Sequence, residues 1–147
     1  MNSKRKKILE KLDDSKERRY MEHLLGEYSL HGVRFPETDD PLADGGYKIE
    51  DGHVTWLVVL TPYPESVPPI SMLSGLRKFT FADRRMKTLP EEFVKLRDLE
   101  YLSCVNKGLT RLPDGFGNLT NLKTLWLEGL PLTSLPSDFG GLESLEE

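Results

Sequence analysis

The stretch "LTRLPDGFGNLTNL", residues 109–122, returns with small changes as "LTSLPSDFGGLESL", residues 132–145. Both copies belong to a longer repetition, in which the same leucine recurs every 23 residues, at Leu76, Leu99, Leu122 and Leu145. A fixed period of this length is typical of a repeat protein, in which one structural unit is stacked several times. The sequence therefore predicts a stack of similar coils over roughly the second half of the chain.

Each unit combines a strand with a turn and a return segment. In "LKTLWL", residues 122–127, leucines alternate with other side chains, as in a short β-strand with one buried face. A Leu-Pro pair follows in every unit, and proline lacks the N–H group that strand pairing needs. These prolines are Pro90, Pro113 and Pro136. Since one coil cannot bury its own leucines, we expect neighbouring coils to stack and to form a parallel sheet.

This unit resembles that of the leucine-rich repeat family, in its 23-residue form LxxLxLxxNxLxxLPxxFxxLxx. The resemblance is carried by "LEYLSCVNKGLTRLPDGFGNLTN", residues 99–121, and by "LKTLWLEGLPLTSLPSDFGGLES", residues 122–144. It extends over three full units and the opening residues of another, starting at Leu76. The resemblance implies an α/β fold, a leucine-rich repeat solenoid with a curved parallel sheet on its concave side.

Local signals upstream of the regular repeats predict a helix and a hairpin. Asp14 at the N-cap with Glu17 three residues later is a capping-box arrangement, which favours a helix over the following residues. Asp51-Gly52 stands between two strand-like runs and predicts a β-hairpin that pairs back on the first repeat strand. The basic run at residues 4–7 is expected to be a solvated, frayed end, with anionic lipid or nucleic acid as the alternative.

We therefore predict two parts of the chain. Residues 1–46 are expected to form an N-terminal helical cap and an acidic loop, because the end coil of a stack otherwise exposes its core to water. The leucine-rich repeat domain is predicted over residues 47–147. Its expected parts are a hairpin with an irregular first repeat (47–75), regular repeats (76–98, 99–121 and 122–144) and the start of another at 145.

Composition narrows the kind of partner and the compartment. The chain has 147 residues and a formal net charge of −4, so no global attraction draws it to nucleic acid or to an anionic membrane. A single cysteine, Cys104, excludes an internal disulfide and a cysteine-based zinc site, and it fits a reducing compartment. No run of residues reads as a signal peptide or as a membrane span, so we expect a cytoplasmic protein.

No set of residues in the sequence suggests catalysis, so we expect neither an enzyme nor a bound cofactor. Cys104 occupies an inward strand position and is expected to be a buried apolar residue rather than a nucleophile. The histidines His23, His31 and His53 lack the spacing of a metal site. The acidic residues Asp39, Asp40 and Asp44 lack the spacing of an EF-hand calcium loop.

The outward positions of the predicted strands form three rows across the sheet, and there we expect a protein partner to bind. The rows are Trp56, Lys78, Tyr101 and Thr124; Val58, Thr80, Ser103 and Trp126; and Leu60, Ala82, Val105 and Glu128. Both tryptophans of the chain stand in these rows, and tryptophan and tyrosine are enriched at binding hot spots. The predicted partner-binding residues are Trp56, Lys78, Thr80, Tyr101, Ser103, Val105, Thr124, Trp126 and Glu128. An alternative for one end of this surface is that the N-terminal helix folds over Trp56, Val58 and Leu60 and makes them part of the core.

The sequence "GLESLEE", residues 141–147, begins a further repeat strand. We expect the chain to be a fragment of a longer array, because a stack normally closes with a polar capping unit. Two alternatives are a degraded gene product and a structural protein whose uncapped C-terminal edge forms a homodimer. A third is a sensor fragment of a larger signalling protein.

Overall fold

A computed structural model of the chain describes residues 3–30, 37–38, 45–60, 69–82, 87–105 and 108–147. The acidic loop residues Asp39, Asp40 and Asp44 lie outside this set. The described elements are two α-helices, α1 (Ser3–Leu9) and α2 (Ser15–Leu30), and five strands, β1 (Gly46–Glu50), β2 (His53–Val59), β3 (Lys78–Phe81), β4 (Tyr101–Val105) and β5 (Thr124–Glu128). Short 3₁₀ helices follow β2 to β5: η1 (Ile70–Met72), η2 (Glu91–Lys95), η3 (Phe116–Asn118) and η4 (Phe139–Gly141).

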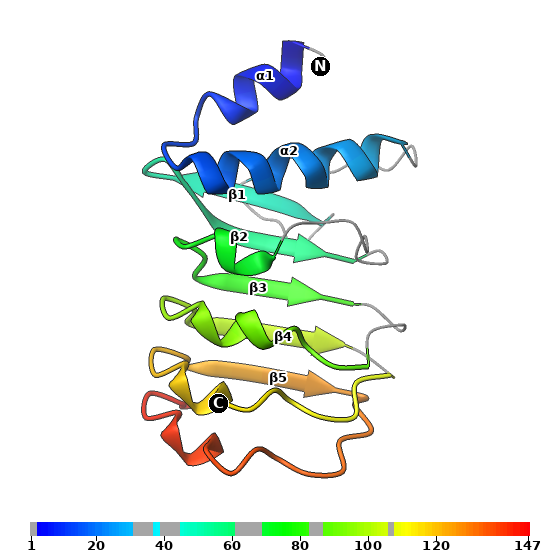
Figure 1. Ribbon diagram of the computed structural model, residues 1–147, viewed down its shortest axis with the longest axis vertical. Coiled ribbons are helices and arrows are strands. Elements are labelled where there is room, and N and C mark those ends of the chain that lie inside the picture. Colours follow the sequence, from blue (N-terminus) through cyan, green and yellow to red (C-terminus); the bar gives the residue numbers. More distant parts are fainter. Residues whose placement is uncertain (1–2, 31–36, 39–44, 61–68, 83–86, 106–107) are drawn as a thin grey trace.

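The strands form one five-stranded sheet in the order β1-β2-β3-β4-β5 (Figure 1). Strands β2 to β5 run parallel, one per repeat unit, whereas β1 pairs antiparallel with β2. The predicted hairpin is confirmed, since Asp51 and Gly52 connect β1 and β2 with φ angles of 50° and 78°. Gly52 also lies against Asp13, and a β-carbon at this position would collide with the Asp13 side chain.

The core lies between the sheet and the 3₁₀ helices, which are stacked on one side of it (Figure 1). Each unit contributes inward strand residues and, in the regular units, a phenylalanine from the 3₁₀ segment, as the repeat pattern predicts. The rings of Phe79 and Phe93 are 6.0 Å apart between centroids, which joins a strand to a 3₁₀ helix of the same unit. Cys104 is fully buried in this core, in line with its predicted role as a small apolar residue.

Helix α2 begins where the sequence predicts, because Asp14 Oδ1 accepts hydrogen bonds from the backbone N–H groups of Lys16 and Glu17. The apolar side chains of α2 belong to the same core as the strands. They are Tyr20, Met21, Leu24, Leu25 and Tyr28. The helix contacts η1 and therefore lies on the same side of the sheet as the 3₁₀ helices (Figure 1).

The prediction of a frayed N-terminus is wrong, since residues 3–9 form helix α1. Leu9 and Leu12 are buried in the core, and Arg5 donates a hydrogen bond to the carbonyl oxygen of Leu25 at 3.0 Å. The basic run carries its lysines on the exposed side of this helix, while apolar residues just after it pack inward. Sequence reasoning gave weight to the charges and too little to these apolar residues.

The last coil is packed less tightly than the one before it. Leu102 on β4 is fully buried, whereas its neighbour Leu125 on β5 is only half-buried. Strand β5 is the edge of the sheet, although the backbone N–H of Leu125 donates to the carbonyl oxygen of Glu147 at 2.7 Å. Residues 146–147 therefore begin to pair with β5 in the way that β5 pairs with β4.

Candidate functional site

The sheet face opposite the core is the surface on which sequence reasoning places a partner. We call it the open face. It consists of Trp56, Val58, Lys78, Thr80, Tyr101, Ser103, Val105, Thr124, Trp126 and Glu128. The residue before or after each of these in the described strands points into the core, as strand alternation requires.

The predicted strand register is confirmed for two complete rows across the parallel strands. The first row is Trp56, Lys78, Tyr101 and Thr124. The second row is Val58, Thr80, Ser103 and Trp126. In the third predicted row only Val105 and Glu128 are paired inside strands, because β2 and β3 end before Leu60 and Ala82.

Exposure divides the open face into two regions. On β4 and β5, Val105 is 43% exposed and Trp126 is 50% exposed, so large apolar side chains meet solvent there. On β2 and β3, Val58 is fully buried and Thr80 is only 7% exposed. The alternative in which the N-terminal helix covers this second region is wrong, because α2 packs on the core side of the sheet (Figure 1).

A residue that sequence reasoning missed, Lys48, extends the first row onto β1. It pairs with Trp56, because the hairpin register shifts between Lys48 and Ile49 and leaves Thr55 unpaired. A simple count back from the Asp51-Gly52 turn places Lys48 opposite Thr55 instead. The sequence pattern does not reveal the bulge, which shifts the register by one residue and brings Lys48 opposite Trp56.

Charged groups around the first row are held in defined contacts. The Lys48 ammonium lies 2.8 Å from Glu50 Oε1, and Thr55 Oγ1 donates to the other oxygen of that carboxylate at 2.8 Å. These two hydrogen bonds, the one from Lys48 being the stronger, lower the pKa of Glu50. The Lys78 ammonium lies 4.7 Å from the ring centroid of Trp56, within the range of a cation–π contact.

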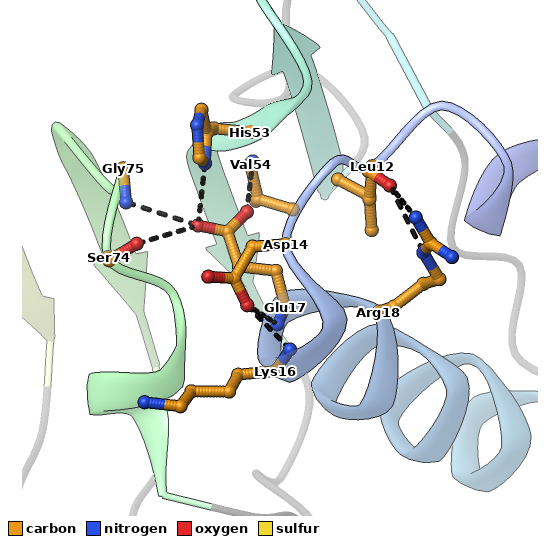
Figure 2. A network of polar contacts seen from close by, with 9 residues as sticks. All are labelled: Leu12, Asp14, Lys16, Glu17, Arg18, His53, Val54, Ser74 and Gly75. Carbon is orange, nitrogen blue, oxygen red and sulfur yellow. Dashed lines mark hydrogen bonds and ion pairs between the residues drawn. The ribbon is translucent and has the colours of Figure 1, made fainter.

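A second group of polar contacts lies at the edge of the sheet where the strands begin, and it is centred on Glu17 (Figure 2). The Glu17 carboxylate is fully buried and accepts hydrogen bonds from the backbone N–H of Val54 at 2.9 Å and of Gly75 at 3.2 Å. His53 Nδ1 lies 3.1 Å and Ser74 Oγ 3.3 Å from Glu17 Oε1. Glu17 therefore joins α2 to the β1–β2 hairpin and to the loop before β3.

The capping-box prediction is half confirmed, since Asp14 caps α2 but Glu17 does not reach back to the N-cap residue. In a capping box the side chain at this position bonds the N-cap backbone N–H. Here buried amides on neighbouring segments compete for the same carboxylate, and burial makes leaving them unpaired costly. Glu17 serves tertiary structure instead of its own helix end.

The Glu17 group borders a polar cleft of about 720 Å³ but lacks the geometry of a nucleophile and its base. In such a pair the serine hydroxyl donates to the histidine, which the carboxylate orients from its other side. Here Ser74 and His53 both contact the same oxygen of Glu17, so the hydroxyl is directed to the acid and not to the imidazole. The arrangement satisfies a buried carboxylate and positions the helix.

The comparisons with known proteins concern the fold. No family model and no curated protein matches the chain. Among the solved structures similar to it is the crystal structure of the LRR ectodomain of the receptor kinase SOBIR1 from Arabidopsis thaliana. The two share 23% sequence identity with a TM-score of 0.58, and the match covers 92% of this chain and 79% of that one.

The chain has a leucine-rich-repeat-like fold. The similarity spans nearly all of its length. At this level of identity the likeness concerns the arrangement of elements, and the properties of the open face must be argued from its own residues.

Three further findings concern the described part of the chain. None of its helices combines the length and the apolar character that crossing a lipid bilayer demands. Within the same residues, histidine, cysteine and acidic side chains do not gather in threes as a metal site would need. Burial raises the pKa of the Cys104 thiol to about 12, which keeps it protonated near neutral pH and makes it a poor nucleophile.

Proposed function

We propose that this chain is a non-catalytic protein-interaction module whose partner binds the open face of the sheet. One observation carries the proposal: Trp126, a large aromatic side chain on the regular strand β5, is 50% exposed on that face. Tryptophan is the residue type most enriched at binding hot spots, and exposing it to water is unfavourable unless a partner covers it.

The surroundings of Trp126 support this proposal. Tyr101 and Val105 on the neighbouring strand are partly exposed on the same face, and Ser103 lies between them in register with Trp126. These side chains are fixed by a parallel sheet with a buried core beneath it. A rigid surface loses little conformational entropy on binding, so more of the contact energy appears as affinity.

Affinity capture from native lysate with the intact chain as bait tests the proposal. The wild type is compared with the double variant Tyr101→Ala, Trp126→Ala and with Lys95→Glu, which changes an exposed residue on η2, on the opposite side of the sheet. A protein retained by the wild type and by Lys95→Glu but lost by the double variant supports binding at the open face. If all three baits retain the same proteins, the open face is not the binding site.

A second candidate function, self-association through the last coil, is favoured by a separate observation. Leu135 is 52% exposed, and Phe139 and Leu127 are only partly buried, so apolar side chains gather at the edge formed by β5 and η4. A second copy that covers this edge would bury them. Light scattering after size-exclusion chromatography should then show a concentration-dependent dimer that Phe139→Glu disrupts, whereas a monomer at all concentrations removes this candidate.

A further inference from the structure

The part of the open face on β1 to β3 differs in charge from the part on β4 and β5. Lys48 and Lys78 flank Trp56 in one row, with Glu50 beside Lys48, while Glu128 stands at the far end on β5. Lys48 is paired with Glu50 at 2.8 Å. Lys78 is exposed, and in the described part of the chain no carboxylate lies within ion-pair distance of its ammonium group. The Glu100 carboxylate, which is paired with Lys123, is near enough to interact with Lys78 electrostatically.

Two polar atoms beside Lys78 are buried without a hydrogen-bond partner in the part of the chain that the structure describes. They are Nε1 of Trp56, which pairs with Lys78 across the strands, and Oγ1 of Thr80, two residues further along β3. The Thr80 side chain points to the open face and is 7% exposed. A buried donor without an acceptor destabilises the folded state, so such atoms in a folded protein need an explanation.

We propose that Trp56, Lys78 and Thr80 form a carboxylate-binding site, which takes the side chain of an aspartate or glutamate in an extended segment of a protein partner. This inference rests on the proposed function of the open face and names the chemistry of its partner. A carboxylate has two oxygens with about four acceptor positions. It can accept from the Trp56 indole N–H and the Thr80 hydroxyl and can pair with the Lys78 ammonium.

A neutral carbonyl group explains less of the geometry than a carboxylate. Its single oxygen has two lone pairs and can accept from the indole and the hydroxyl, but it carries no charge and so forms no ion pair with Lys78. Charge-assisted hydrogen bonds are roughly twice as strong as neutral ones. The Lys78 ammonium now lies over the Trp56 ring, and its flexible stem allows it to leave the ring and admit the acidic group.

The site is joined to the exposed aromatic part of the open face. Tyr101 is the next residue of the first row after Lys78, and Ser103 follows Thr80 in the second row. A peptide chain that crosses the strands can therefore place an acidic side chain at Lys78 and apolar side chains against Tyr101 and Trp126. The acidic side chain belongs at this end, because Glu50 and Glu100 are already paired with Lys48 and Lys123 there and Lys78 is not in an ion pair, whereas Glu128 at the other end would repel it.

The probe for the test is a blocked synthetic peptide of alternating glutamate and threonine, together with its glutamine counterpart, titrated into the intact, isotope-labelled chain. The chain has 2 tryptophans, and the spectrum of a Trp126→Phe variant identifies the indole N–H signal of Trp56. The glutamate peptide should move this signal downfield, as a new hydrogen bond to a carboxylate requires. The glutamine peptide should bind about tenfold more weakly or worse.

Matched variants separate recognition at this site from general charge attraction. Lys78→Met should weaken binding of the glutamate peptide by about tenfold, whereas Lys95→Met, with the same change in net charge, should leave it unchanged. Thr80→Val removes the unpaired hydroxyl, so it should weaken binding while raising the urea midpoint of unfolding. A role in stability alone does not produce these opposite changes.

Several results overturn the inference: no binding of the glutamate peptide, equal weakening by both lysine variants, or an unmoved Trp56 indole signal. The proposed function can survive any of them, because the lysate capture depends on Tyr101 and Trp126 and not on Lys78. If the capture fails as well, the open face as a binding surface is refuted together with its acidic partner.

Discussion

Replacing Glu17 with alanine should destabilise the fold more than any surface change on α2. The Glu17 carboxylate is fully buried and accepts from the backbone N–H groups of Val54 at 2.9 Å and Gly75 at 3.2 Å. The buried Val54 donor left without an acceptor costs about 1–3 kcal/mol, and the partly exposed Gly75 N–H adds less because water can replace its acceptor. The two losses together are a substantial part of the about 5–15 kcal/mol that stabilises an ordinary domain.

The assay is urea unfolding followed by circular dichroism, with the midpoint and the slope fitted together. Glu17→Ala should lower the midpoint at an unchanged slope. Glu17→Gln keeps one oxygen as an acceptor and turns an amide donor towards the remaining N–H group, so we expect about 1–3 kcal/mol of destabilisation. Hydrogen exchange at the amides of Val54 and Gly75 should become faster in both variants.

The matched control is Glu22→Ala, which removes an exposed carboxylate from the same helix. Its effect should stay within about 0.5 kcal/mol, as for most surface substitutions. If Glu17→Ala and Glu22→Ala unfold at the same urea concentration, the Glu17 contacts do not hold α2 against the hairpin, and the reasoning fails.

Three further outcomes follow from the packing and the charges. Leu102→Ala should lower the free energy of unfolding by about 2–5 kcal/mol, and Leu125→Ala by less, because Leu102 is fully buried and Leu125 is half-buried. Equal losses in urea unfolding would contradict this difference in packing. Cys104 is buried and its thiol pKa is raised to about 12, so a thiol reagent should not label it in the native chain. Unfolding in guanidinium chloride should expose the thiol and make it reactive. Rapid labelling of the native chain would refute its burial. The hydrogen bond from Lys123 holds the pKa of Glu100 below its ordinary value of 4.5. The ionised carboxylate therefore stabilises the fold at pH values above 4.5, and this contribution is lost as the pH falls through the folded-state pKa. Lys123→Met should raise the pKa of Glu100 in an NMR titration, and an unchanged pKa would show that this contact is not formed in solution.

The features that sequence reasoning predicted well depend on short stretches of chain. The 23-residue period and its alternating apolar residues place β3, β4 and β5 and their buried faces, while β2 belongs to the irregular first repeat. The two complete rows of the open face follow from aligning these four strands. The hairpin at Asp51-Gly52 and the N-cap at Asp14 are equally local, since each depends on the backbone conformation of a few residues.

The features that it missed depend on groups far apart in the chain. Glu17 leaves its own helix end because a buried amide 37 residues away and a partly buried one 58 residues away both donate to it. Lys48 reaches the row of Trp56 through a bulge, and α1 becomes ordered by packing against the core. None of these contacts has a signal in the residues immediately around it.

By itself, the sequence determined which residues face the core and which face outward, because strand alternation and a fixed repeat period are properties of the chain. Only the tertiary structure decided how each outward residue is surrounded, with Thr80 and Val58 buried and Trp126 half-exposed on the same face. The physical reason is that burial and hydrogen bonding depend on what packs against a side chain from other strands and loops. The alternation of the strand carries no information about those neighbours.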